Sequence, residues 1–176
     1  MEEVNNKTIH SSFWTNIFNY PTEKSGLQIS LQSIPLFESL GKRDLALILN
    51  IIHSRRYLTG EFIFYQGDPG IGLYVIREGD VRIIRSDEED NEIELATISK
   101  GDFFGELAMV DGEKRSASAV AKTDVRAAVI FKPDLDEFIE KYPKKGIKIL
   151  FGISKIIATR LRLLDADFFS LQKMNK

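Results

Sequence analysis

The sequence contains no cysteine and only two histidines, His10 and His53, among its 176 residues. The absence of thiols excludes disulfides, iron–sulfur clusters, cysteine nucleophiles and thiolate zinc sites. Two histidines are too few for a multi-histidine metal centre, so a metal-dependent enzyme on a jelly-roll barrel ranks low among the candidate functions. We therefore expect no metal site and no catalytic residue.

The sequence also lacks a strong charge of either sign and a long hydrophobic run. The formal net charge is −2, whereas proteins that bind the nucleic-acid backbone usually carry a basic excess. No apolar run approaches the roughly 18 residues that span a bilayer. The polar, acidic first residues do not resemble a signal peptide. These absences predict a cytoplasmic protein with no DNA partner and no membrane partner.

Glycine is present but unevenly placed, with eight of the twelve residues lying between positions 60 and 112. There they separate short apolar stretches, a spacing typical of strands and tight turns. We expect Glu78-Gly79-Asp80 to close one hairpin and residues 86–92 to form the tip of another. The predicted strands are Glu61–Tyr65, Gly72–Arg77, Val81–Arg85, Ile93–Ile98, Ser116–Ala121 and Val125–Phe131.

Helical patterns flank this glycine-rich region on both sides. Asp44–Ile52 is dense in Leu and Ile, and residues 51–53 are interpreted as the end of that helix. Pro133 stands at a first helical position, and Tyr142-Pro143 ends the short helix that it begins. A long helix is predicted from about Lys144 to Leu171. Its apolar stripe consists of Leu150, Ile153, Ile157, Leu161, Leu164, Phe168 and Leu171, widened by Ile149, Ile156 and Leu163.

The stripe has two interpretations. It packs wholly on its own domain, or it packs there with one edge and on a second copy of the chain with the other. Its width favours the second interpretation and thus a homodimer through the C-terminal helix. For residues 1–26, a docking helix with Phe13 and Ile17 on one face and a loosely ordered arm are equally compatible with the sequence.

Residues 104–118, FGELAMVDGEKRSAS, hold the side chains best suited to binding an anion. Gly105 leads into a short helical turn whose backbone N–H groups favour an anion. Arg115 can bind two phosphate oxygens with its planar guanidinium, and Ser116 adds a hydroxyl. Glu106 would repel a phosphate, so we expect it to accept a hydrogen bond from a neutral hydroxyl of the same ligand. A phosphate and a hydroxyl together indicate a sugar phosphate.

This segment resembles the phosphate-binding cassette of the cyclic nucleotide-binding domain family, which includes bacterial catabolite activators and the regulatory subunits of cyclic-AMP-dependent protein kinase. The family pattern is F-G-E-L-A-L, a short loop, then R-[ASTG]-A-[ST]. Here Met109 replaces the usual Leu, and Lys114 stands where kinase subunits often have Pro. Residues 34–37, 60–68 and 73–81 also resemble earlier parts of that domain, so the likeness extends from about residue 27 to 165.

The resemblance implies an α+β fold, with an antiparallel β jelly-roll barrel at about residues 54–131 flanked by N-terminal helices and a long C-terminal helix. Residues 27–176 would form the cyclic nucleotide-binding domain, with lid and dimer helices at about 133–172, and residues 1–26 the N-terminal arm. The implied function is a non-enzymatic regulatory module for cyclic AMP or cyclic GMP, with no prosthetic group. It would signal to an unknown effector protein through its C-terminal helices, with the short helix Asp134–Lys141 as the hinge.

The implied ligand-binding residues are Gly105, Glu106, Leu107, Ala108, Arg115, Ser116, Leu161 and Leu164. Glu106 would bind the ribose 2′-hydroxyl and Arg115 the cyclic phosphate, assisted by backbone amides of the cassette. Where bacterial members offer Thr and Ser to the purine, this chain has Leu164 and Asp165, so Leu161 or Leu164 would cap the base by apolar contact. Asp165 could hydrogen-bond guanine, and Ser116 is compatible with either base, but cyclic AMP is favoured over cyclic GMP. The alternative is a dimeric scaffold with this fold and an unused pocket.

Overall fold

The computed structural model describes residue 31 and residues 34–89 and 91–174, which belong to two compact units. One unit takes in residues 51–135 and holds all the described strands. The other takes in the described residues up to 50 and those from 136 onward, and it is helical. Helix α4 (Lys132–Lys141) begins in the first unit and ends in the second. The predictions for the N-terminal arm, residues 1–26, lie outside the described residues.

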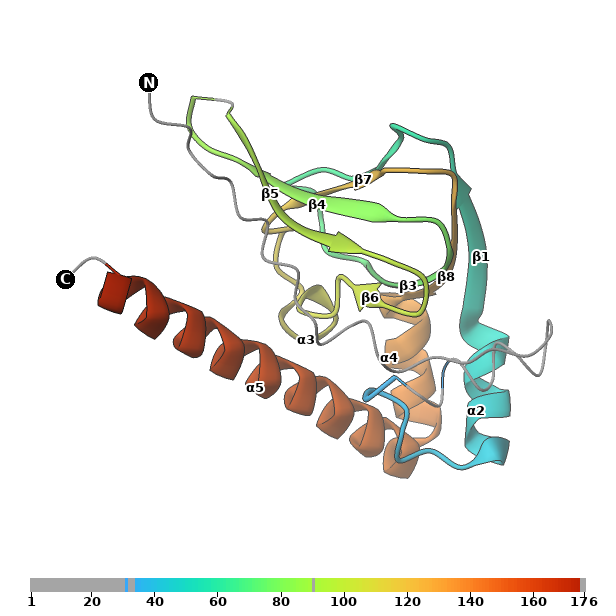
Figure 1. Ribbon diagram of the computed structural model, residues 1–176. Helices are drawn as coiled ribbons and strands as arrows, with labels where there is room; N and C mark the ends of the chain where they lie inside the picture. The colour runs from blue at the N-terminus through green and yellow to red at the C-terminus, as the bar shows by residue number, and fades with distance from the viewer. Residues whose placement is uncertain (1–30, 32–33, 90, 175–176) are drawn as a thin grey trace, which may run out of the picture. The chain divides into compact units, whose positions relative to one another are not determined.

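The strands of the first unit form two four-stranded antiparallel sheets (Figure 1). The order is β1-β8-β3-β6 in one sheet and β2-β7-β4-β5 in the other. This arrangement, with the long C-terminal helix, confirms the predicted α+β class with an antiparallel jelly-roll barrel. The strands are β1 (Ile52–Tyr57), β2 (Phe62–Phe64), β3 (Gly72–Glu78), β4 (Val81–Ser86), β5 (Glu92–Ile98), β6 (Phe103–Phe104), β7 (Ser118–Ala121) and β8 (Val125–Phe131).

A buried apolar cluster draws on both sheets. In β8 it takes every second residue, Val125, Ala127 and Val129, as the alternation of side chains in a strand requires. Burial of this apolar surface is the main favourable contribution to the stability of the barrel. The other members of the cluster are Tyr74, Ile76, Val81, Ile98, Phe104, Ala119 and Ala121.

Strand β1 corrects the interpretation of residues 51–53 as the end of a helix. Helix α2 (Lys42–Ile48) stops earlier and is followed by a 3-10 turn, Leu49–Ile51. His53 lies in β1, which pairs with β8 in a continuous antiparallel register. The apolar run through this region is compatible with either structure, and strand β8, which decides it, lies about seventy positions further along the chain.

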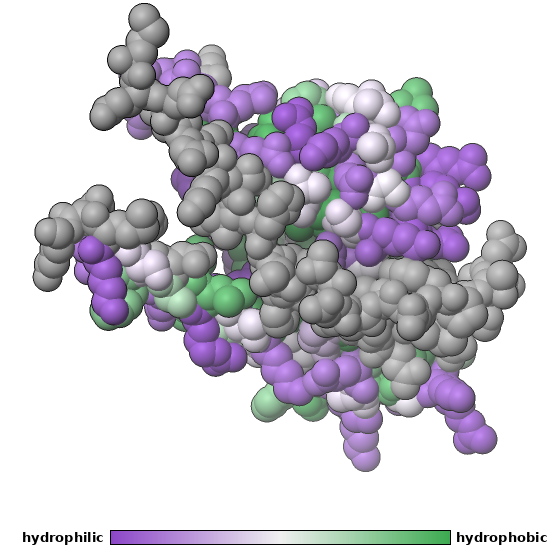
Figure 2. All heavy atoms as spheres, in the orientation of Figure 1, coloured by the Kyte–Doolittle hydropathy of each residue, from purple (hydrophilic) through white to green (hydrophobic). Residues whose placement is uncertain are grey.

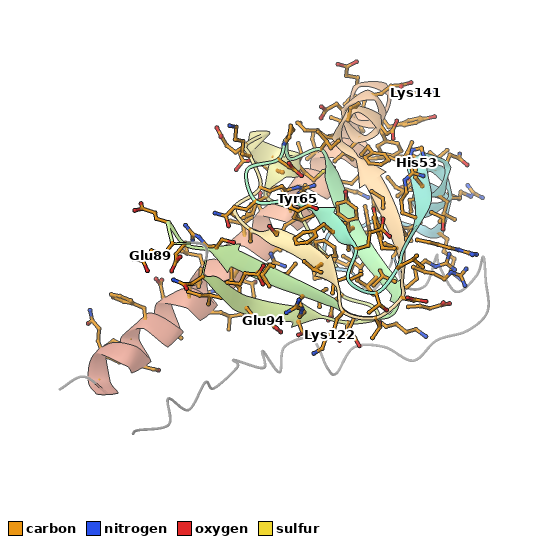
Figure 3. All side chains as sticks on the ribbon, turned by 90° about the horizontal axis from the view of Figure 1, so that it is seen from above. His53, Tyr65, Glu89, Glu94, Lys122 and Lys141 are labelled. Carbon is orange, nitrogen blue, oxygen red and sulfur yellow. The ribbon has the colours of Figure 1, made fainter. Side chains whose placement is uncertain are left out.

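The turn at Gly79 does not close the predicted hairpin, because β3 and β4 belong to different sheets. Gly79 has φ +81°, and a Cβ there would lie 2.1 Å from the Asp124 carbonyl oxygen. The turn therefore crosses between sheets in close contact with the β7–β8 connection. The second predicted hairpin is confirmed, since β4 and β5 pair along their length. Figure 3 labels Glu89 near its tip and Glu94 on β5.

In the second unit, α5 (Pro143–Met174) packs against the segment before α2. Gly152 lies against the backbone of Leu36, and the Lys148 Nζ donates to the Ser39 carbonyl oxygen at 3.2 Å. Lys155 forms an ion pair with Glu38. These contacts fix one face of the first half of the helix.

The predicted apolar stripe of α5 is divided between buried and exposed residues. Ile149, Ile153 and Ile156 are buried, whereas Leu161 and Leu164 are 58% and 65% exposed. Two of the three buried residues were predicted only to widen the stripe. Hydrophobic side chains (green) are visible among hydrophilic ones (purple) along this helix in Figure 2. Within the described ranges, no helix is long and apolar enough to cross a membrane.

Replacing Gly152 by alanine is expected to destabilise the fold. A Cβ at this position would lie 2.5 Å from the Leu36 carbonyl oxygen, so the backbone must shift to admit it. Overpacking costs about 1–3 kcal/mol, against a gain of up to about 1 kcal/mol when alanine replaces glycine within a helix. Urea unfolding measures the difference. As a control, Gly41→Ala meets no atom within 4 Å and should change stability by less than about 0.5 kcal/mol. A Gly152→Ala protein more stable than wild type would contradict this packing.

Candidate functional site

The segment predicted to bind an anion begins where β6 ends and continues into helix α3 (Ala108–Asp111). Gly105 joins the two with φ +83°, a conformation that L side chains rarely adopt. A Cβ on Gly105 would lie 2.6 Å from the Gly72 carbonyl oxygen and 2.8 Å from the Arg115 Nη1. Gly112, in the left-handed conformation, ends the helix. Only glycine lets the chain approach Arg115 this closely.

Arg115 is buried, with 6% of its surface exposed. Its Nη2 donates to the Gly72 carbonyl oxygen at 2.8 Å, and its Nη1 donates to the Gly105 carbonyl oxygen at 3.3 Å. Its backbone is fixed as well, because its N–H donates to the Asp68 carbonyl and its carbonyl accepts from the Gly67 N–H, both at 2.8 Å. Three separate segments thus determine where the guanidinium lies.

Aromatic rings surround the same guanidinium. The Arg115 Cζ lies 4.1 Å from the ring centroid of Phe64 and 5.7 Å from that of Tyr74. Tyr74 is itself stacked on Phe104, with centroids 5.1 Å apart and an interplanar angle of 10°. The sequence-based prediction missed Phe64 and Tyr74, although the short apolar stretches that carry them were assigned to strands. Neither ring lies within the cassette segment.

Burial is the main cause of the pKa shifts at this site. Burial lowers the pKa of the Arg115 guanidinium, while Tyr74 and Glu106 oppose that shift. Burial raises the pKa of the Tyr74 phenol, and it raises that of Tyr57 to about 12. Both phenols are therefore neutral at pH 7. Arginine stays protonated in proteins, so the site keeps a buried positive charge.

Glu106 brings a carboxylate to the same site, with 1% of its surface exposed. Its backbone carbonyl accepts from the Met109 N–H at 3.1 Å, which sets the turn that opens α3. Its negative charge is among the interactions that favour the protonated state of Arg115. A buried cation beside a buried carboxylate suits a ligand that offers both an anionic group and a hydroxyl.

The other predicted cassette residues differ in exposure. Ala108 is buried, and a Cβ on Gly70 would lie 2.1 Å from its side chain, so the loop before β3 packs directly on α3. Leu107 and Ser116 are exposed. Ser118, which was not predicted as a site residue, is buried, and its Oγ accepts from a backbone N–H in the β2–β3 loop at 2.8 Å.

Leu161 and Leu164, the predicted base-capping residues, lie on α5 in the second unit, where both are exposed. The structure brings Gly105, Glu106 and Arg115 together within the first unit. In the part of the chain that the structure describes, no group of three or more His, Asp or Glu side chains gathers that could hold a metal ion.

The first turn of α4 is fastened to the barrel unit at three points. The Lys132 Nζ donates to the Met109 carbonyl oxygen of α3 at 3.4 Å, and the Lys132 N–H donates to the Ile71 carbonyl at 2.9 Å. Two residues further on, Asp134 lies 2.9 Å from the Nε2 of His53, which Figure 3 labels. The cassette helix is thus connected directly to the start of α4.

The chain is similar to many known proteins. It is 34% identical over 137 residues to the cyclic AMP receptor protein of Thermus thermophilus, over 78% of this chain and 62% of that protein. It is 38% identical over 142 residues to the cAMP-dependent protein kinase type II regulatory subunit of Drosophila melanogaster, over 74% and 37% of the two chains. The crystal structure of the T. thermophilus catabolite activator protein matches with a TM-score of 0.69 and 35% identity, over 78% and 63%.

The chain spans less than two thirds of the length of each of these relatives. The family model of the cyclic nucleotide-binding domain matches residues 54–142, which contain the barrel strands from β2 to β8, the cassette and α4. The matched family model and the observed fold agree, and the chain belongs to the cyclic nucleotide-binding domain family.

Proposed function

We propose that this chain is a non-enzymatic regulatory module that binds a cyclic mononucleotide, with cyclic AMP favoured over cyclic GMP. The observation that carries the proposal is the buried guanidinium of Arg115, held beside the buried carboxylate of Glu106 in a member of this family. Relatives named as a cyclic AMP receptor and as regulatory subunits of a cAMP-dependent kinase support the same ligand class.

In this proposal the cyclic phosphate binds Arg115 and the ribose 2′-hydroxyl donates to Glu106. The phosphate competes with the carbonyl oxygens of Gly72 and Gly105, which accept from the guanidinium. A phosphate oxygen carries more negative charge than a carbonyl oxygen, so the charge-assisted bond is the stronger one. The backbone amides of Gly105, Leu107 and Ala108 and the hydroxyl of Ser116 would assist.

The preference for adenine follows from the apolar character of the proposed cap. Leu161 and Leu164 are exposed on α5 and offer the base no hydrogen-bond partner. Asp165, the next residue on the same helix, is the side chain that would instead favour guanine. Guanine carries a carbonyl, a ring N–H and an exocyclic amine at its edge. Burying these polar groups against leucine without partners costs more than burying the smaller polar edge of adenine.

Signalling is proposed to pass through α4 into the C-terminal helix. The support is the pair of side-chain contacts in its first turn, Lys132 to the cassette helix and Asp134 to His53. A ligand that rearranges α3 acts on α4 through Lys132. The ligand shifts the equilibrium between two positions of the C-terminal helices only by the difference between its affinities for the two states.

The second candidate function is a dimeric scaffold whose pocket is unused. Its support is the row of exposed apolar side chains along the second half of α5, Leu161, Leu164, Phe168 and Phe169. An isolated protein does not ordinarily expose a row of this kind, and we propose that a second copy covers it in a homodimer. Where the pocket is used, Leu161 or Leu164 caps the base and the rest of the row packs on the second copy. Calorimetry separates the two functions, because a scaffold with an unused pocket gives no binding heat with cyclic AMP.

Removing the guanidinium of Arg115 should abolish most of the affinity for cyclic AMP. We expect Arg115→Ala to weaken binding by about 2–5 kcal/mol, as when a buried charged partner is lost. Isothermal titration calorimetry measures the change, with Lys114→Ala, an exposed neighbour, as the control. Arg115→Lys keeps the charge but loses the two-pronged guanidinium geometry. Its affinity for cyclic AMP should lie between those of wild type and Arg115→Ala. Equal affinity of wild type and Arg115→Ala would refute the assignment.

The role of Glu106 is tested with a ligand that lacks the hydroxyl. Wild type should bind 2′-deoxy cyclic AMP more weakly than cyclic AMP by about 1.5–3 kcal/mol, the range for a hydrogen bond to a charged group. Glu106→Gln should weaken cyclic AMP binding and reduce the difference between the two ligands, because both changes act on one bond. Glu113→Gln, on the exposed loop, should keep the wild-type difference. If Glu106→Gln kept the full wild-type difference in affinity between the two ligands, the 2′-hydroxyl would not bind Glu106.

Lys132 is expected to carry the ligand's effect to α4. In wild type, cyclic AMP should change hydrogen–deuterium exchange in residues 133–141. Lys132→Met removes the bond to Met109 and should largely abolish that change, while affinity alters by less than about tenfold, as for one hydrogen bond of about 1 kcal/mol. Lys122→Met is the matched control, since Lys122 is exposed and lies apart from the cassette (Figure 3). An unaltered exchange response in Lys132→Met would exclude this route.

A further inference from the structure

Arg115 has a neighbour that no part of the proposed binding mode uses. The ring of Phe64, on β2, lies 4.1 Å from the centre of the guanidinium, inside the distance at which a cation interacts with an aromatic face. Tyr74, at 5.7 Å, is the more distant of the two rings around Arg115. Phe64 is the aromatic side chain best placed to act on this charge.

A ring beside a guanidinium differs from a hydrogen-bonding partner in what it leaves available. A guanidinium is planar, and its five N–H bonds lie in that plane. An aromatic ring stabilises the charge through its electron-rich face and takes up none of these donors. In Arg115, the bonds to the Gly105 and Gly72 carbonyl oxygens use Nη1 and Nη2, and the Tyr74 side chain also hydrogen-bonds the guanidinium. Nε has no hydrogen-bond partner among the described residues. Donors therefore remain in a cation that is otherwise stabilised.

Stabilisation of this kind matters because Arg115 is buried. Burial lowers the pKa of the guanidinium and disfavours its charged form. A carboxylate bound face to face with the guanidinium would offset that cost but would also neutralise the charge and occupy the donors that an anion needs. A neutral aromatic ring offsets part of the cost and leaves the net charge unchanged.

We infer that Phe64 is a positioning residue for the anion site: it holds the Arg115 guanidinium in place, charged and with donors free to bind a phosphate. The ring acts through Arg115 and needs no contact with the ligand. The inference rests on the proposed function for its effect on affinity, but the position of the guanidinium is a property of the ligand-free protein.

The same strand provides a matched control. Phe62 is also partly buried in β2, but its ring is stacked on Tyr65, with centroids 4.2 Å apart and an interplanar angle of 16°. Tyr65 is labelled in Figure 3. Phe62→Leu therefore removes a phenylalanine of similar burial from the same strand without removing the ring over Arg115.

The first test observes the ligand-free protein by NMR. A ring 4.1 Å from the guanidinium centre shifts the Arg115 side-chain proton resonances by its ring current. We expect this shift to be lost in Phe64→Leu and retained in Phe64→Tyr and Phe62→Leu. Retention of the shift in Phe64→Leu would overturn the inference, whether or not the protein binds a cyclic nucleotide.

The second test measures cyclic AMP affinity by calorimetry. Phe64→Leu should raise Kd roughly 5- to 30-fold, the equivalent of a desolvated cation–aromatic interaction. Phe64→Tyr should stay within about threefold of wild type, because tyrosine offers a similar ring face. Phe62→Leu should likewise bind nearly as wild type does. Equal losses in Phe64→Leu and Phe62→Leu would show a packing effect only and overturn the inference.

A fluorinated series separates the electrostatics of the ring from its shape and covers the case in which Phe64→Leu fails to fold. Fluorination at position 64 withdraws electron density from the ring face while the ring keeps nearly the same size. Kd should rise with each added fluorine at position 64 and stay constant for the same series at position 62. A flat series at position 64 would overturn the inference. If wild type binds no cyclic nucleotide, the proposed function fails, and the NMR test still decides the role of Phe64.

Discussion

The site depends on keeping one positive charge buried in the barrel with hydrogen-bond donors still available to a ligand. Arg115 meets this requirement through weak partners on several sides: two carbonyl oxygens, the face of Phe64 and the nearby Tyr74. These partners lie on β2, on β3 and on the segment between β6 and α3. The glycine at position 105 is needed because the chain passes too close to the guanidinium for any side chain. The local backbone conformation is therefore a consequence of where the charge lies.

The cassette could be predicted from the sequence because it is local. Gly105, Glu106 and Arg115 lie within eleven positions, and the chemistry that they support can be inferred from residue type and spacing. Strand β8 was predicted with its observed bounds, since its alternation and length are typical of a strand. These elements need no information from distant parts of the chain.

What the sequence did not predict depends on partners far along the chain. The ring of Phe64 reaches Arg115 across fifty positions, so nothing near the cassette indicates it. His53 was assigned to a helix end because an apolar run near a helix is ambiguous until its partner strand is known. Gly79 has the residue type of a hairpin turn, but the sheets that it connects are set by the closure of the barrel. In each case the deciding contact is tertiary.

Helix α4 has one more consequence, which concerns the length of the chain. It is an unbroken helix of ten residues that passes from one compact unit into the other. A flexible linker absorbs an inserted or deleted residue, but a helix advances about 100° per residue. One residue added within α4 would therefore rotate the side chains that follow it in this helix by more than a quarter turn. Helix α4 should therefore tolerate changes of residue type far better than changes of length.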